Sequence, residues 1–240
     1  MIIVAGTIGA GKSTLTELLA QDLQTKPFYE NVDDNEVLPL FYSDPAKYAF
    51  LLQIFFLNKR FLSIKDAFTH EDNVLDRSIY EDSMLFHLNA DLGRISDVEV
   101  EQYDNLLETM LKELEDISPQ KKPDLLVYIK VSFETMLKRI QKRGRDYEQI
   151  EQDPDLYNYY KELNRRYNEW YENFDICPKI VIDGDNYDFV ANPECADIII
   201  KKIRDVAQNM DWDPMLEKKR YTTEVPEAKG IFSRPIAEIK

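Results

Sequence analysis

A glycine-rich stretch near the start of the chain has the spacing of a phosphate-binding loop. Residues 6–13 read GTIGAGKS, which fits the pattern GxxxxGK[ST], and the apolar run MIIVA precedes them. Between a strand and a helix, such a loop aims backbone N–H groups at phosphate oxygens. Its lysine, Lys12, then reaches the β- and γ-phosphates, and Ser13 binds Mg²⁺. The sequence therefore predicts an ATP site formed by Gly6, Thr7, Ile8, Gly9, Ala10, Gly11, Lys12, Ser13 and Thr14.

This loop predicts the phosphate donor but not the acceptor, because kinases, GTPases and mechanical ATPases share it. A GTPase would also carry DxxG and NKxD motifs, and the nearest string, NKRF at residues 58–61, lacks the aspartate. The short chain without an obvious additional module favours a small-molecule kinase. A regulatory ATPase stays open as an alternative.

Charged residues end two further segments that have the composition of strands. Glu30 ends the segment 27–30, and Asp76 and Arg77 follow the apolar residues of the segment 73–76. In a parallel sheet these ends lie near the phosphate loop. A carboxylate there can accept the proton of an acceptor hydroxyl, and Arg77 can hold Glu30 or a developing negative charge. Taken singly, each could also be a cap or a surface pair.

Two polar residues interrupt a helix that is otherwise apolar nearly all round. Gln53 and Arg60 are seven residues apart, or two helical turns, so both project from one face. An amide and a guanidinium on that face could read the edge of a planar base on which neighbouring phenylalanines stack. The alternative is that Gln53 is a core residue and Arg60 a surface charge.

Basic residues are concentrated in the stretch 137–145, LKRIQKRGR. Arg139 and Arg143 share a helical face, and the glycine before Arg145 lets the chain turn back. Such a segment could close on the transferring phosphates as a lid and neutralise their charge. The alternative is a basic last turn that complements the helix dipole.

The elements that position these residues alternate between strand and helix. Strands are predicted at 2–5, 27–30, 73–76, 125–130 and 179–182, and helices at 12–24, 45–68, 79–90, 96–117, 132–143, 154–173 and 194–209. This alternation predicts an α/β fold with a five-stranded parallel sheet flanked by helices. We expect residues 1–210 to form one kinase domain and residues 211–240 an extended or partly disordered tail.

The composition, 44% apolar and 31% charged over 240 residues, is that of a soluble globular domain. The formal net charge of −15 argues against nucleic acid or an acidic membrane as a partner. No segment has the length of a membrane span, and the apolar start lacks the basic flank of a signal peptide, so we expect a cytoplasmic protein. The cysteines and histidines form no metal-binding spacing, and we interpret them as structural: Cys177, Cys195, His70 and His87.

Taken together, these motifs resemble the deoxynucleoside kinase family, in particular its bacterial deoxyadenosine and deoxyguanosine kinase branch. The similarity lies in the phosphate loop, YENV at 29–32, FLLQ at 50–53, DRS at 76–78 and RIQKRGR at 139–145, in that order. It covers about residues 1–210 and implies the P-loop nucleotide-kinase fold with an arginine-rich lid.

The resemblance also implies roles for individual residues. It makes Glu30 the carboxylate that activates the nucleoside 5′-hydroxyl beside Arg77, and it places Asp76 near Mg²⁺. Gln53 takes the position that hydrogen-bonds the base. Further positions match the pair found in members that accept purines or deoxycytidine, Arg60 and Asp82, and the groups that hold the sugar 3′-hydroxyl, Tyr42 and Glu148. An ion pair between Glu148 and Arg145 within the lid is the alternative for Glu148.

The chain departs from the family pattern at two positions. Asn31 replaces a proline often found after the catalytic glutamate, and Asn35 stands where several eukaryotic members have a pocket tryptophan. Both changes leave the chemistry intact but alter the wall beside the base. The family also implies a homodimer.

The sequence thus predicts Mg²⁺-dependent transfer of the ATP γ-phosphoryl group to the 5′-hydroxyl of a deoxyribonucleoside. The expected acceptor is a purine deoxynucleoside, first deoxyadenosine; deoxyguanosine and the pyrimidine nucleoside deoxycytidine stay open as alternatives. One alternative is a nucleoside monophosphate kinase, which would need further basic residues for the acceptor phosphate. The other is the regulatory ATPase, for which the tail is the one candidate partner surface.

Overall fold

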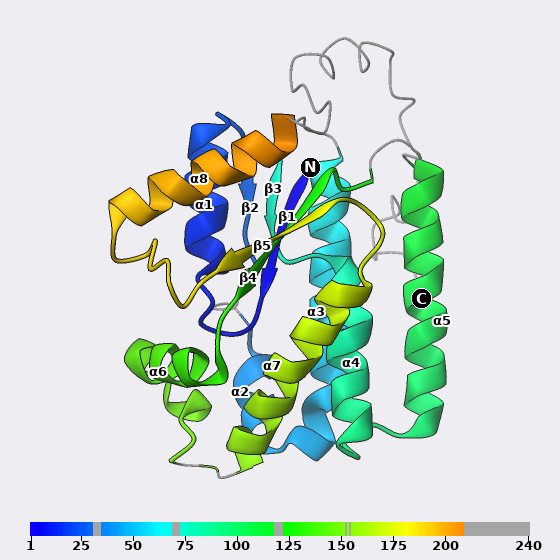
Figure 1. Ribbon diagram of the computed structural model, residues 1–240. Helices are drawn as coiled ribbons and strands as arrows, with labels where there is room; N and C mark the ends of the chain where they lie inside the picture. Colours follow the sequence, from blue (N-terminus) through cyan, green and yellow to red (C-terminus); the bar gives the residue numbers. More distant parts are fainter. Residues whose placement is uncertain (31–34, 69–72, 118–121, 152, 154, 209–240) are drawn as a thin grey trace.

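A five-stranded parallel sheet forms the centre of the molecule (Figure 1). The computed structural model describes residues 1–30, 35–68, 73–117, 122–151, 153 and 155–208. The strands are β1 (Ile2–Gly6), β2 (Pro27–Phe28), β3 (Val74–Asp76), β4 (Leu125–Lys130) and β5 (Lys179–Asp183). Their order is β2-β3-β1-β4-β5, so the strand that leads into the phosphate loop is the central one.

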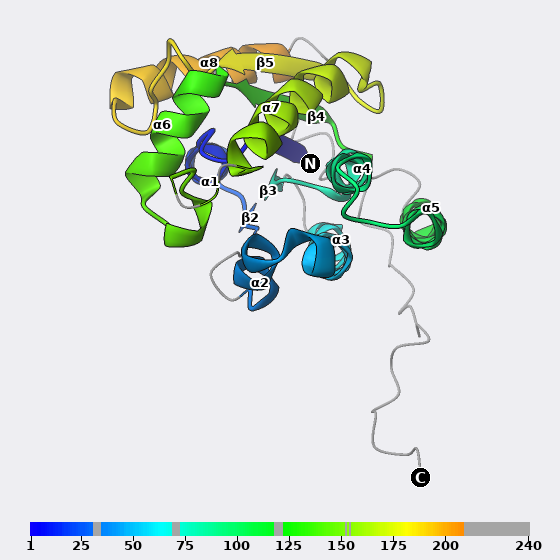
Figure 2. The same ribbon diagram turned by 90° about the horizontal axis from the view of Figure 1, so that it is seen from below.

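Helices cover both faces of this sheet. They are α1 (Lys12–Asp22), α2 (Val37–Ser43), α3 (Pro45–Ala67), α4 (Asp82–Asp91), α5 (Asp97–Ile117), α6 (Phe133–Arg143), α7 (Asp155–Asn173) and α8 (Pro193–Gln208), with two 3-10 turns, η1 (Ile79–Glu81) and η2 (Asp146–Glu148). Figure 2 shows α1 and α8 on one face and α4 and α7 on the other, with α5 outermost beyond α4. Because both faces are covered, all five residues of β1 are buried.

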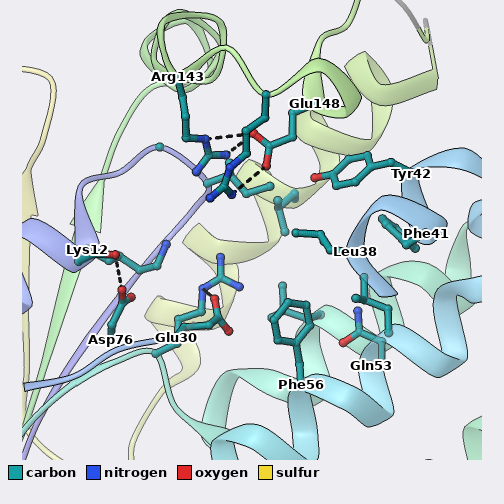
Figure 3. Close-up of a pocket in the computed structure, with 18 of the residues that line it drawn as sticks. Lys12, Glu30, Leu38, Phe41, Tyr42, Gln53, Phe56, Asp76, Arg143 and Glu148 are labelled. Carbon is teal, nitrogen blue, oxygen red and sulfur yellow. Dashed lines mark hydrogen bonds and ion pairs between the residues drawn. The ribbon is translucent and has the colours of Figure 1, made fainter. Parts of the chain in front are cut away.

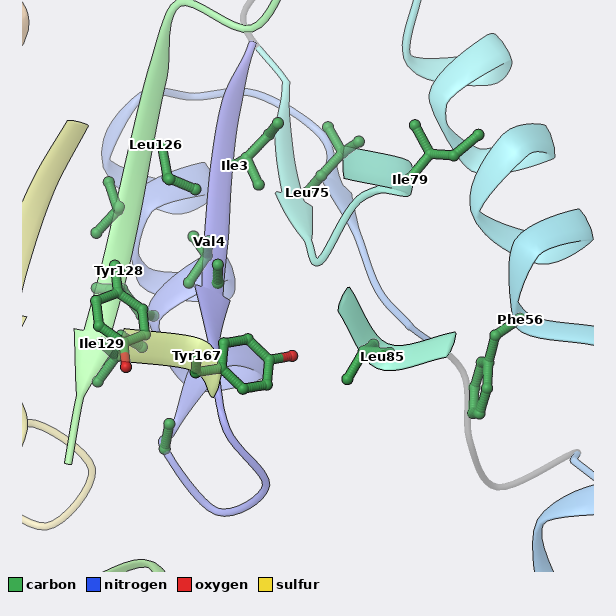
Figure 4. Packing of buried hydrophobic residues seen from close by; sticks show 14 of the residues in the cluster. Ile3, Val4, Phe56, Leu75, Ile79, Leu85, Leu126, Tyr128, Ile129 and Tyr167 are labelled. Atoms are coloured by element: carbon green, nitrogen blue, oxygen red, sulfur yellow. The ribbon is translucent and has the colours of Figure 1, made fainter. Parts of the chain in front are cut away.

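The core extends over both faces of the sheet, and Figure 4 shows the part where the inner strands meet α4 and α7. Ile3 of β1 pairs with Leu75 of β3 on one side and with Leu126 of β4 on the other. All three side chains are at most 2% exposed. This packing fixes the carboxyl ends of the strands, and Figure 1 shows α2 and α6 beyond that edge of the sheet.

All five predicted strands and the predicted parallel sheet are confirmed, with ends that differ by one or two residues. The segment predicted as a helix over 79–90 is divided into η1 and α4, because Ser78 and Glu81 form a capping box on the 3-10 turn. Two elements were not predicted, α2 and η2. Residues 211–240 lie outside the described residues, so the predicted tail stays a prediction.

Candidate active site

The predicted phosphate loop joins the end of β1 to the start of α1. Gly9 and Gly11 have φ values of 75° and 97°, in the left-handed region that favours glycine. A Cβ atom at Gly9 would lie 3.1 Å from the Cβ of Arg139, and one at Gly11 would lie 3.0 Å from the ring of Phe189. Both the backbone conformation and the close neighbours therefore require glycine at these positions.

Lys12, Ser13 and Asp76 meet at the base of this loop. The ammonium group of Lys12 donates to the carbonyl of Thr7 at 3.0 Å. Burial, followed by the positive charge of Arg77, lowers the Lys12 pKa to about 8. The Ser13 hydroxyl donates to Oδ2 of Asp76 at 2.5 Å, whereas the buried Oδ1 of Asp76 has no hydrogen-bond partner among the described residues.

Two arginines hold Glu30. Nε of Arg60 donates to Oε1 of Glu30 at 2.9 Å, and its Nη2 contacts the same oxygen. Nε of Arg77 lies 3.4 Å from Oε2 of Glu30. The remaining terminal nitrogen of Arg60 pairs with Asp82, which is fully buried. Arg60 thus bridges Glu30 and Asp82, so its guanidinium is part of the charge network around the predicted catalytic carboxylate.

This network sets the ionisation of the carboxylates. Burial opposes the charge on Glu30, but Arg60, Arg77 and Lys12 outweigh it and lower the Glu30 pKa. At Asp82 burial dominates and raises the pKa to about 7, against the attraction of Arg60. Glu30 is therefore the carboxylate that the site keeps ionised.

A cavity connects these groups with the apolar face of α3 (Figure 3). It is lined on the chemical side by Lys12, Glu30 and Arg77, and on the far side by Gln53. Oε1 of Gln53 is buried and has no hydrogen-bond partner among the described residues. Apolar and aromatic side chains fill the wall between them: Leu38, Phe41, Leu52, Phe56 and Leu85. Such a site can enclose a flat molecule and read one polar edge of it.

A second, more open pocket lies on the other side of the phosphate loop. Lys12 and Ser13 line both spaces, so the phosphate loop lies between them. After their predicted roles, we call the first space the acceptor cavity and the second the donor side. Basic residues of α6 line the donor side, and the segment 188–191 between β5 and α8 closes it. Sequence reasoning missed this segment, because a short loop of mixed composition carries no signal until the fold places it beside Gly11.

The predicted lid arginines have different partners. Nη2 of Arg143 donates to Glu148 at 2.5 Å, and Nη1 of Arg145 lies 3.6 Å from the other Glu148 oxygen. Arg139 donates instead to the carbonyls of Ala10 at 3.2 Å and Gly184 at 2.7 Å. Arg139 thus braces the phosphate loop, while Arg143 and Arg145 face the acceptor cavity with Glu148 between them. The ion pair between Glu148 and Arg145, which was the alternative from the sequence, is present.

Helix α2 completes the acceptor cavity. It carries Leu38 and Tyr42, and the Tyr42 ring lies 5.1 Å from the ring of Tyr147 in the lid. Asn35 caps the helix, because its side-chain oxygen accepts from the backbone N–H groups of Val37 and Leu38 at 2.9 and 3.0 Å. Asn35 therefore shapes the wall through the backbone of α2. The other departure, Asn31, lies outside the described residues.

No group of three or more His, Cys, Asp and Glu side chains that could hold a metal ion occurs among the described residues. Cys177 and Cys195 are free thiols, and His87 pairs with Asp104. His70 lies outside the described residues. In the part of the chain that the structure describes, no helix is both long and apolar enough to cross a membrane.

Comparison with known proteins agrees with this two-sided site. The sequence model of the deoxynucleoside kinase family matches residues 2–208. The chain belongs to the deoxynucleoside kinase family. Like the family, it is an ATP-dependent phosphotransferase, and neither the nucleoside monophosphate kinase nor the regulatory ATPase is favoured. The expected homodimer and cytoplasmic location stay predictions.

Curated members of the deoxynucleoside kinase family are similar over most of their length. A deoxyguanosine kinase of Lactobacillus acidophilus is 56% identical over 218 residues, 89% of this chain and 95% of that protein. A deoxyadenosine kinase of the same organism is 49% identical over 203 residues, 85% of this chain and 94% of that protein. The solved structure of a deoxyadenosine kinase from M. mycoides with bound dATP superimposes with a TM-score of 0.70. It is 29% identical and covers 85% of this chain and 98% of that one.

Proposed function

We propose that this kinase transfers the γ-phosphoryl group of ATP to the 5′-hydroxyl of a purine deoxynucleoside, with deoxyguanosine preferred over deoxyadenosine. The observation that carries the proposal is one cavity with Glu30 and Arg77 at one end and the Gln53 amide oxygen at the other, which has no hydrogen-bond partner within the described part of the chain. An amide can pair with the N1/N6 edge of adenine or the N1/O6 edge of guanine. The order of preference follows the relatives, of which a deoxyguanosine kinase is the more similar.

In this proposal Glu30 accepts the proton of the 5′-hydroxyl while the oxygen attacks the γ-phosphorus atom. Its low pKa makes it a weak base, which suits a loose transition state in which the proton leaves late. Arg77 holds the second oxygen of Glu30, so the carboxylate keeps one orientation towards the hydroxyl. Lys12, together with Arg143 and Arg145, supplies positive charge where the phosphoryl charge spreads.

Mg²⁺ fits the residues at the base of the loop. The buried Oδ1 of Asp76 has no hydrogen-bond partner among the described residues, and Ser13 lies beside it. We propose that Ser13 and Asp76 hold the ion together with phosphate oxygens of ATP. When bound, Mg²⁺ would neutralise phosphate charge.

Tyr42 and Glu148 are proposed to hold the sugar 3′-hydroxyl. Both line the cavity between Gln53 and the lid arginines, and Glu148 is only 2% exposed. A hydroxyl that binds Glu148 competes there with Arg143 and Arg145. Nucleoside binding would therefore release arginine donors towards the phosphates.

A panel of the four deoxynucleosides with ATP and Mg²⁺ tests the proposed substrate class. We expect kcat/KM to be highest for deoxyguanosine, next for deoxyadenosine, and at least about tenfold lower for thymidine, which corresponds to roughly 1.4 kcal/mol of transition-state binding. Gln53→Leu should lower kcat/KM for both purines by removing the polar edge contact. Equal or better use of thymidine by the unchanged protein would contradict the proposal.

A further inference from the structure

Arg77 has a backbone conformation that its own sequence does not favour. Its φ is 67°, in the left-handed region, where a side chain with a Cβ costs about 1–2 kcal/mol. Arg77 directly follows β3, and its N–H donates to the carbonyl of Val4 at 2.9 Å. The conformation turns its guanidinium out of the sheet and towards Glu30. Something must hold this turn, because strain of this kind persists only where the surroundings impose it.

Glu81 stabilises the backbone turn at Arg77. It lies behind the turn and does not line either substrate space. Its Oε1 accepts from the backbone N–H of Ser78, the residue after Arg77, at 3.1 Å. Its Oε2 accepts from the hydroxyl of Tyr167 at 2.8 Å. Both Glu81 and Tyr167 are 0% exposed. The two oxygens of one buried carboxylate thus join the Arg77 turn to helix α7.

Helix α7 makes further hydrogen bonds on both sides of Tyr167, which fix its position. Figure 4 shows the Tyr167 ring within the buried cluster, with its hydroxyl directed towards the α4 side. One turn further on, the indole N–H of Trp170 donates to the carbonyl of Tyr80 at 3.2 Å. Two turns before Tyr167, the hydroxyl of Tyr160 donates to the backbone carbonyl of Glu148 at 3.1 Å. The same helix face therefore holds both the Arg77 turn and the lid.

Charge explains why the hydroxyl of Tyr167 matters. Glu81 feels the positive charges of Arg77, Arg60 and Lys12, the cations that also surround Glu30. A buried carboxylate that loses a hydrogen-bond donor seeks another partner. Without the Tyr167 hydroxyl, Glu81 would compete with Glu30 for the guanidinium of Arg77.

We propose that Glu81 and Tyr167 are positioning residues for Arg77, and that their hydrogen bond keeps this arginine directed at Glu30 rather than at Glu81. The inference rests on the proposed roles of Glu30 and Arg77. Neither Glu81 nor Tyr167 touches a substrate space, so they affect the chemical step and not the binding of either substrate.

Tyr167→Phe removes one hydroxyl and keeps the ring packing. We expect kcat to fall about tenfold, because small displacements of reacting groups are costly, while both KM values stay within about twofold. The acidic limb of the kcat pH profile should also move to higher pH, because less positive charge near Glu30 raises its pKa. The matched control is Tyr128→Phe, which also removes a buried hydroxyl, one that donates to Asn168 at 3.2 Å. The inference would be overturned if Tyr167→Phe had the same kcat as Tyr128→Phe and the same position of the acidic limb in its pH profile.

A double-mutant cycle separates this inference from the proposed function. If Tyr167 acts through Arg77, Tyr167→Phe should lower kcat by less than about twofold when Arg77→Lys is already present. A full tenfold loss in that background would show that Tyr167 acts elsewhere and would overturn the inference. Arg77→Lys alone tests the underlying role: unchanged activity of that single variant would remove Arg77 from the proposed mechanism.

Discussion

Glu30 is the residue on which the charges of the active site converge. Arg60 and Arg77 each take one of its oxygens, and Lys12 adds a third positive charge nearby. This arrangement keeps the carboxylate ionised and fixed in direction. The proposed role of Glu30 as proton acceptor needs its charge as well as its shape, and glutamine, which has the same shape without the charge, separates these two requirements.

Glu30→Gln should lower kcat by about a hundredfold or more, because the amide cannot accept the proton of the 5′-hydroxyl. ATP affinity should change by less than about twofold, since Glu30 does not line the donor side. Steady-state kinetics and equilibrium ATP binding measure the two effects. Glu36→Gln, at an exposed glutamate before α2, is the control for a change of net charge. Unchanged kcat in Glu30→Gln would remove this residue from the mechanism.

For single side chains, the sequence predicted which of them meet better than it predicted how they pair. The convergence of Glu30, Asp76 and Arg77 follows from strand ends that share one edge of a parallel sheet, a property of the topology. The pairing of Arg60 with Asp82 was implied by the family resemblance and is present, whereas its contact with Glu30 was not predicted, because helical spacing gives a face but no partner. The contacts of Arg139 with loop carbonyls were also missed, since the lid sequence alone suggests contacts with phosphates.

Helix α2 shows what sequence patterns overlook at the scale of elements. It has only seven residues, with a proline among them, so it carries too little periodicity for prediction. Its start depends on Asn35, which is 4% exposed and caps two backbone N–H groups. The longer helices and all five strands were predictable, because each repeats its apolar pattern over several turns or follows a turn signal.

Asn35→Ala should destabilise α2 and, with it, the wall of the acceptor cavity that Leu38 and Tyr42 form. Loss of the cap should lower the free energy of unfolding by about 1 kcal/mol. A lower midpoint of thermal or denaturant unfolding would measure this loss. We expect KM for the nucleoside to rise about three- to tenfold while KM for ATP stays unchanged, because Leu38 and Tyr42 line only the acceptor cavity.

The control for this prediction is Asn192→Ala. The side-chain oxygen of Asn192 accepts from the backbone N–H of Glu194 at 3.0 Å near the start of α8, and Asn192 does not line the acceptor cavity. This variant should lose comparable stability without a change in nucleoside KM. If both variants raise KM alike, the effect is one of general stability and not of α2.

On the scale of the whole molecule, an acidic chain collects its positive charge at one edge of the sheet. The net charge of −15 required a local basic concentration, and the fold supplies it with Lys12 and Arg77 facing the arginines of the lid. A polyphosphate is attracted there and repelled elsewhere. Gathering these cations lowers the stability of the fold, because they repel each other and lose contact with water.

Lys12 makes this cost measurable as a dependence of stability on pH. Its pKa is about 8 in the folded protein and 10.5 as the ordinary value, so the unfolded chain binds more protons between these pH values. Lys12 should therefore make the free energy of unfolding increase as pH rises from about 8 to 10.5, so the protein becomes more stable. Below pH 8 the charged ammonium lowers stability by its full amount.

Lys12→Met isolates this contribution, because other groups titrate equally in both proteins. Without ATP at pH 7, the variant should unfold at a higher temperature than the unchanged protein, by roughly 6 °C for about 2 kcal/mol. The difference should shrink as pH rises from about 8 towards 10.5, because Lys12 is then neutral in the folded chain and progressively loses its proton in the unfolded chain as well. Thermal unfolding across this pH series measures it. A difference that is constant with pH would show that Lys12 keeps its ordinary pKa, and the cost of gathering cations around the phosphate loop would then lie in another residue.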